Sequence, residues 1–230
     1  MDHPVVSHEE WLSARKALLD KELAITRDLD ALRAARRQLP WVKVDRAYVF
    51  EGPKGTRSLG DLFCGRRQLA IYHFMLTPGS DHICPGCAFV MDHVDAARQH
   101  FEQADLAFAA VARAPIEQIE EAKARMGWTF AWVSSGGNDF NHDFDVSFTA
   151  EDRDAGRATY NYGKTAIQKS PDMFGVSMFV KDDAGGIFHS YSTYHRGVEL
   201  LIGAFNWLDL APKGRNEKGT MSWVRLHDEY

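Results

Sequence analysis

Residues 68–76 read QLAIYHFML, and this nearly continuous apolar run is typical of a strand that is buried on both faces. The loop TPGSDHI follows at 77–83, and the cysteine pair Cys84-Pro85-Gly86-Cys87 comes directly after it. In 88–101 the apolar residues recur at helical spacing with polar residues between them, which predicts a helix from Ala88 to Phe101. The pair is therefore expected at a junction between a buried strand and a helix.

The elements on either side of this stretch alternate between strand and helix. Such alternation favours an α/β fold built on one sheet. A second buried strand and then an antiparallel hairpin follow the cysteine pair, which is the order of a thioredoxin-like fold, a mixed sheet flanked by helices. The predicted elements are short strands at 41–44, 48–51 and 130–134, a strand at 106–112, a helix at 116–126, a hairpin at 175–181 and 187–194, and a last helix at 197–208.

Three segments are expected along the chain. Residues 1–40 form an N-terminal helical extension, 41–208 the thioredoxin-like domain, and 209–230 a C-terminal tail packed on that domain. Ser7 and Glu10 form a capping-box pattern at the start of a long helix that Pro40 ends. Apolar residues recur every seven positions in this helix, which permits a homodimer formed through it: Trp11, Leu18, Ile25, Leu32 and Leu39.

Bulk composition excludes several function classes. The formal net charge is −5, from 27 Lys and Arg against 32 Asp and Glu, so no basic excess points to nucleic acid. The first residues are polar and acidic, without the apolar core of a signal peptide, and no run approaches the length of a membrane span. We expect a cytoplasmic protein that binds neither nucleic acid nor membrane.

Only three cysteines occur in 230 residues, which argues against a disulfide framework. Cys84 is placed just before the predicted helix, where unpaired N–H groups favour a thiolate. Pro85 suits the first helical position, and Cys87 lies about one turn further on. Cys84 is thus the expected attacking thiol and Cys87 the resolving thiol. His82 could raise the thiolate fraction of Cys84 by its positive charge, or be a solvated loop residue.

A non-enzymatic alternative stays open for these residues. His82, Cys84 and Cys87 could supply three zinc ligands with a distant fourth such as His142, which would make the protein a non-catalytic binding module. The third cysteine, Cys64, is expected to be a small buried hydrophobe. We expect neither a metal nor a cofactor.

The sequence resembles the DUF899 family of bacterial proteins, described as thioredoxin-like dithiol–disulfide oxidoreductases. The likeness covers nearly the whole chain. The stretches that carry it are 48–52, 58–63, 69–75, 84–87, 112–115, 125–128, 139–144, 212–217 and 223–230.

The resemblance implies an enzyme that cycles Cys84 and Cys87 between dithiol and disulfide, with a disulfide or oxidised-thiol substrate and a thiol reductant. Thioredoxins place a cis-proline near the cysteines, just before the hairpin. Val176 and Ser177 are expected to shape the site here, with Ser177 at the position of that proline and Gly86 within the motif. Peroxiredoxins instead use Pro-x-x-x-Thr/Ser-x-x-Cys. Counted back from Cys84, the proline position holds Thr77 and the hydroxyl position holds Asp81, while Pro78 and Ser80 are each one place off. A thiol peroxidase is therefore the second choice of enzyme.

Overall fold

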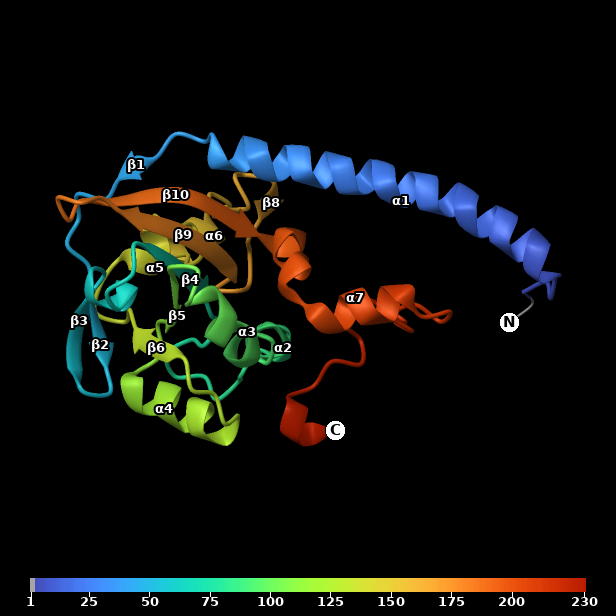
Figure 1. The fold of residues 1–230 in the computed structure, drawn as a ribbon. Helices are drawn as coiled ribbons and strands as arrows, with labels where there is room; N and C mark the ends of the chain where they lie inside the picture. Colours follow the sequence, from blue (N-terminus) through green and yellow to red (C-terminus); the bar gives the residue numbers. More distant parts are fainter. Residues whose placement is uncertain (1–2) are drawn as a thin grey trace. The chain divides into compact units, whose positions relative to one another are not determined.

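A computed structural model describes residues 3–230 of the chain (Figure 1). The chain divides into two compact units, one that ends at Pro40 and one that spans Trp41–Tyr230. The first unit is the 30-residue helix α1, His8–Arg37. Ser7 caps it by accepting the Glu10 N–H at 3.2 Å, while the Glu10 carboxylate accepts the Ser7 N–H at 2.9 Å. The predicted capping box is therefore confirmed.

No residue of α1 is buried, and the apolar residues that recur every seven positions are exposed. A homodimer through this helix stays a prediction. No helix within residues 3–230 combines the length and the apolar character needed to cross a bilayer.

The second unit is built on one mixed sheet of eight strands. Their order across the sheet is β1-β10-β9-β4-β5-β6-β2-β3. β4 runs parallel to β5, which runs parallel to β6, whereas β9 is antiparallel to β4 and β10 to β9. The strands are β1 Val42–Lys43, β2 Val49–Gly52, β3 Gly55–Ser58, β4 Gln68–His73, β5 Leu106–Ala112, β6 Ala131–Ser134, β9 Gly175–Lys181 and β10 Ile187–Tyr194.

This topology is that of a thioredoxin-like α/β fold, as predicted. The cysteine pair follows the central strand β4, a parallel strand follows the pair, and the antiparallel hairpin β9–β10 pairs on the other edge of β4. The β4, β5 and hairpin positions expected from the sequence are confirmed to within three residues.

Each face of the sheet carries its own apolar core. One core forms beneath α2 Pro85–Met91, α3 Val94–Phe101 and α4 Ile116–Arg125 and includes Tyr72. The other includes Ile71 and lies beneath η1 Asp61–Phe63 and α5 Phe140–Asp143. Successive residues of a strand point to opposite faces, so β4, which is buried from Leu69 to His73, can serve both cores.

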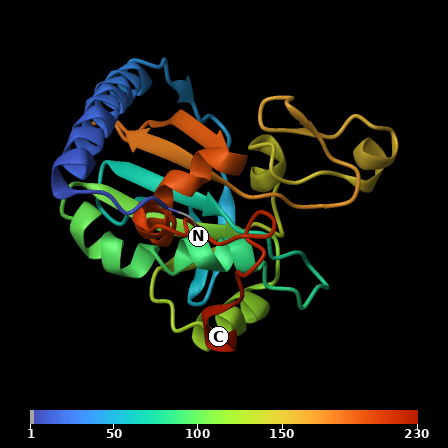
Figure 2. The same ribbon diagram turned by 90° about the vertical axis from the view of Figure 1, so that its right-hand side faces the viewer.

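The remaining elements lie beyond the sheet and the helices named above. α6 Ala150–Asp154, β7 Thr159–Tyr160 and β8 Thr165–Ala166 belong to a segment that reaches out from the sheet (yellow and gold in Figure 2). After β10 come η2 His195–Leu201, α7 Gly203–Leu210 and, near the end of the chain, η3 His227–Glu229.

Two predicted helices are each divided into two in the structure. The helix expected over 88–101 is split between α2 and α3, and it starts earlier, at Pro85. At the break, the Asp92 carboxylate accepts from Trp128 Nε1 at 2.8 Å and lies 2.7 Å from His227 Nδ1. The helix expected over 197–208 is likewise divided between η2 and α7. The spacing of apolar residues along the sequence does not report long-range contacts of this kind, so it does not predict these breaks.

A buried carboxylate, Asp172, fixes the segment that leads into β9. Its exposed fraction is 2%. It accepts Arg113 Nε at 2.6 Å and Nη2 at 2.9 Å, the Thr77 hydroxyl at 2.6 Å and the Ser147 hydroxyl at 2.5 Å. Bidentate pairing with Arg113 and two further donors satisfy the buried charge.

Asp172→Ala should destabilise the protein strongly, because it leaves Arg113 and two hydroxyl groups without their acceptor. We expect a loss of about 3–5 kcal/mol in the free energy of unfolding. Urea unfolding followed by tryptophan fluorescence measures it. Asp183→Ala is the matched control, since Asp183 pairs with Arg67 while its own side chain is 92% exposed; a similar small change in both variants would contradict the role of Asp172.

Candidate functional site

The cysteine pair opens helix α2. Cys84 is the N-cap residue with extended backbone, and Pro85 occupies the first turn. The sulfur of Cys84 accepts the backbone N–H of Cys87 at 3.4 Å. Both cysteines are free thiols; Cys87 is buried and Cys84 is partly exposed. Proline at this position costs no hydrogen bond, so the local sequence itself favours a helix that starts between the two sulfurs.

Cys84 has the properties of an attacking thiol. The Cys87 thiol and the backbone N–H groups of Cys87 and Gly86 donate to its sulfur and lower the pKa of Cys84 to about 7, against the opposing effect of burial. Hydrogen bonds to the charged form stabilise a thiolate. A substantial fraction of Cys84 is therefore ionised at neutral pH.

Cys87 is the opposite case. Burial raises its pKa well above that of a free thiol, and the neighbouring Cys84 adds to the rise. The Tyr72 hydroxyl and the backbone of Met75 act on the Cys87 sulfur in the other direction. Two thiols one helical turn apart thus differ strongly in acidity, and only Cys84 is ready to act as a nucleophile.

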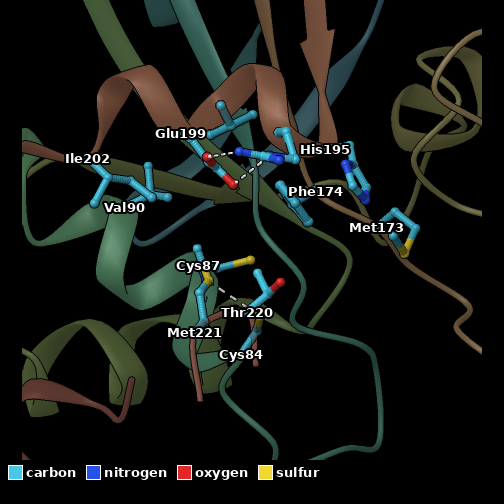
Figure 3. Close-up of a pocket in the computed structure, with 13 residues that line it drawn as sticks. Cys84, Cys87, Val90, Met173, Phe174, His195, Glu199, Ile202, Thr220 and Met221 are labelled. Carbon is cyan, nitrogen blue, oxygen red and sulfur yellow. Dashed lines mark hydrogen bonds and ion pairs between the residues drawn. The ribbon is translucent and has the colours of Figure 1, made fainter. Parts of the chain in front are cut away.

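A cavity of about 260 Å³ opens directly onto this pair (Figure 3). Its wall comes from four parts of the chain: α2, the segment before β9, η2 and the C-terminal tail. In Figure 3 Cys84, Cys87, Thr220 and Met221 lie on one side of the space, across from Phe174, His195 and Glu199. Further lining side chains are Val90, Met173, Arg196, Val198 and Ile202.

The C-terminal tail forms part of the site because it is anchored in the core. Val224 and Leu226 are buried in the same apolar cluster as Cys87. Trp223 stacks edge-on against Phe89 of α2, and its indole N–H donates to the Arg215 carbonyl at 2.9 Å. A Cβ on Gly86 would lie 3.4 Å from the Met221 sulfur. The tail therefore passes close to the N-terminus of α2.

The structure places the other predicted site residues differently. His82 is exposed and does not line the cavity. Val176 is buried in the core on the same face as Cys87. Ser177 points to the opposite face, where its hydroxyl lies 2.8 Å from His73 Nε2 and 2.8 Å from the Ser192 hydroxyl. This corrects the position expected for Ser177, because β9 begins at Gly175 and its side chains alternate from there.

Met173 and Phe174 were missed by the sequence reasoning. They precede β9 and line the cavity beside the cysteines. No peptide bond within residues 3–230 is cis. The available signal was their place directly before the hairpin, where the resemblance puts a residue that faces the pair. The cavity-lining residues of η2 and of the tail carried no signal in the sequence.

The remaining sequence hypotheses concern Cys64, zinc and peroxide. Cys64 is exposed, so its expected burial is wrong; its thiol lies 3.6 Å from the Asp61 carbonyl. In residues 3–230 no group of three or more His, Cys, Asp or Glu side chains is arranged to hold a metal ion, and His142 lines a separate pocket. Neither Thr77 nor Asp81 lines the cavity at Cys84.

A family model described as "Bacterial protein of unknown function (DUF899)" matches residues 1–230. Comparison with curated proteins finds no match. Among solved structures, similarity extends to a PrxQ mutant from Xylella fastidiosa, with 14% identity, 73% of this chain and 94% of that chain covered, and a TM-score of 0.45.

Two further similar structures are peroxidoxin BcpB from Mycobacterium tuberculosis and a putative protein disulfide isomerase from Bacteroides thetaiotaomicron. The first has 12% identity, covers 72% of this chain and 97% of that chain, and has a TM-score of 0.48. The second has 16% identity, covers 78% and 94%, and has a TM-score of 0.39. The fold assignment itself rests on the strand order and directions given above.

The acidity of Cys84 can be measured from its alkylation rate. In a Cys64→Ser background, which removes the exposed third thiol, the rate of Cys84 carbamidomethylation by iodoacetamide should rise with pH and reach half its plateau near pH 7, the pKa of Cys84. The rate rises because only the thiolate reacts. Mass spectrometry of quenched samples measures it, and the Cys64→Ser/Cys84→Ser variant supplies the blank. A midpoint near 8.5, that of an ordinary cysteine, would contradict the assignment.

Proposed function

We propose that this chain, which belongs to the DUF899 family of bacterial proteins, is a dithiol–disulfide oxidoreductase that cycles Cys84 and Cys87 between dithiol and disulfide. The observation that carries the proposal is the asymmetry of the pair. Cys84 has a lowered pKa and opens onto a cavity, whereas Cys87 is buried with a raised pKa one helical turn away. Such a pair can attack a disulfide with one thiol and resolve the product with the other.

The first step is attack by the Cys84 thiolate on one sulfur of a substrate disulfide R–S–S–R′. A new Cys84–S–S–R bond forms, the substrate S–S bond breaks, and R′–S⁻ leaves and takes up a proton. In the second step the deprotonated Cys87 attacks the Cys84 sulfur. The Cys84–Cys87 disulfide forms and R–S⁻ leaves, so the substrate gains two electrons and the pair loses two.

The environment of Cys87 explains how the second step becomes possible. The nearby Cys84 raises the pKa of Cys87 in the reduced protein. Once Cys84 has formed the mixed disulfide, its sulfur carries no negative charge and no longer accepts a strong hydrogen bond from the Cys87 thiol. The interactions of the Cys87 sulfur with the Tyr72 hydroxyl and the Met75 backbone, which favour the thiolate, remain. Cys87 therefore becomes easier to ionise when its thiolate is needed.

An external thiol reductant must return the pair to the dithiol form, by the same exchange run in reverse. No cofactor takes part in this proposal. The alternative of a non-catalytic module would leave the thiols reduced in the presence of a disulfide.

Single-cysteine variants test the cycle. Wild-type protein with dithiothreitol should reduce bis(2-hydroxyethyl) disulfide faster than dithiothreitol alone, and Cys84→Ser should lose this gain. Reduced, desalted Cys87→Ser mixed with the same disulfide in the absence of dithiothreitol should accumulate the mixed disulfide on Cys84, seen as one added thiol group by mass spectrometry, because no resolving thiol remains. Cys64→Ser is the matched control and should keep the wild-type rate. Equal rates for wild type and Cys84→Ser would falsify the proposed activity.

A further inference from the structure

The cavity at the cysteine pair has an apolar lining near the sulfurs. Val90, Val198 and Ile202 are buried, with exposed fractions of 1–3%. Phe174 and the two methionines Met173 and Met221 add flexible or aromatic apolar surface. At about 260 Å³ the space falls just below the range typical of drug-sized ligands. It suits a compact molecule with little polar surface.

Charged side chains of the lining are already paired. The Glu199 carboxylate accepts Arg196 Nε at 3.1 Å and lies 3.3 Å from Arg215 Nη1. Arg196 itself is 74% exposed, so its guanidinium lies at the solvent end of the cavity. Because Arg215 also pairs with Asp209 at 2.8 Å, the two guanidinium groups are matched by two carboxylates, and these groups leave no unbalanced charge at the wall to pair with one on a ligand. The part of the substrate that enters is therefore expected to be uncharged.

The geometry of the site disfavours binding of a protein substrate. A common way for an extended peptide to bind is to pair with free backbone groups beside a strand. At this site the backbone carbonyl of Phe174, directly before β9, already accepts the Tyr160 hydroxyl. On the opposite side, the tail at Thr220 and Met221 occupies the approach to α2, and the buried Val224 and Leu226 hold it there. The cavity that opens onto Cys84 is bounded by this tail and by Phe174.

We propose that the oxidised substrate is a low-molecular-weight disulfide with an uncharged apolar arm, and that this arm occupies the cavity lined by Val90, Phe174, Val198 and Ile202 while Cys84 attacks its sulfur. This inference rests on the proposed oxidoreductase function and follows the same electron balance. The apolar arm leaves as a thiol when Cys87 resolves the mixed disulfide.

A matched pair of small disulfides tests the proposal. Dipropyl disulfide and bis(2-hydroxyethyl) disulfide differ only in a methyl or a hydroxyl at each end. Reduced, desalted full-length protein is mixed with each, and formation of the Cys84–Cys87 disulfide is followed by acid quench and mass spectrometry. The two rates are divided, and the ratio is compared with the same ratio for free dithiothreitol, which reports intrinsic reactivity alone.

The protein's ratio should exceed that of dithiothreitol by roughly tenfold, from burial of a methyl in place of a hydroxyl. Met173→Gln and Met221→Gln, both at partly buried wall positions, should bring the ratio at least threefold closer to that of dithiothreitol. Leu200→Gln is the matched control on η2, because Leu200 is 65% exposed and does not line the cavity. It should keep the wild-type ratio.

A wild-type ratio equal to that of dithiothreitol overturns the apolar-arm inference and leaves the oxidoreductase function intact. Faster oxidation by the disulfide of a folded protein than by dipropyl disulfide, at equal concentration, overturns it as well. Failure of the pair to react with either small disulfide removes the proposed function, and this inference with it.

Discussion

β4 is paired on both edges and buried on both faces, and this double constraint organises the protein. Parallel pairing with β5 on one edge and antiparallel pairing with β9 on the other leave none of its backbone free. Its side chains must then serve two different cores by simple alternation. Tyr72 reaches the Cys87 side of the sheet, and the next residue, His73, hydrogen-bonds to Ser177 on the other side. The chain emerges from this strand toward α2, so the position of the cysteine pair follows from β4.

The same alternation separates two chemistries that lie close together in the sequence. Burial lowers the pKa of His73 to about 3, so the imidazole is neutral at pH 7. It is part of a chain of hydrogen bonds through Ser177 and Ser192 to His189, on the face away from the thiols. His73 therefore contributes to packing and hydrogen bonding, and no histidine side chain on that face reaches Cys87.

What the sequence could predict follows from how local each signal is. The apolar run at 68–76, the capping box at Ser7 and the Cys84-Pro85-Gly86-Cys87 turn are local, and the structure agrees with all three. The start of β9 at Gly175 was predicted correctly, but alternation along the strand puts Val176 on the cysteine face and Ser177 on the other, and Phe174, three residues before Ser177, lines the cavity. The contributions of η2 and of Met221 are tertiary: residues more than a hundred positions from Cys84 close the cavity. The helix break at Asp92 has the same origin, since its partners Trp128 and His227 lie far along the chain.

An apolar cavity disfavours the charged thiolate that an attacking cysteine needs, and hydrogen-bond donors within one helical turn of Cys84 offset this effect. Burial by Val90, Val198 and Ile202 disfavours a charged sulfur. The N–H of Cys87, held at 3.4 Å by the start of α2, and the Cys87 thiol offset this penalty and bring the pKa of Cys84 to about 7. A thiol attacks a disulfide best when its pKa is near the ambient pH, because a lower value weakens the nucleophile and a higher one depletes the thiolate. The donors that stabilise the thiolate come from the motif itself, so the walls of the cavity can be apolar while Cys84 stays partly ionised.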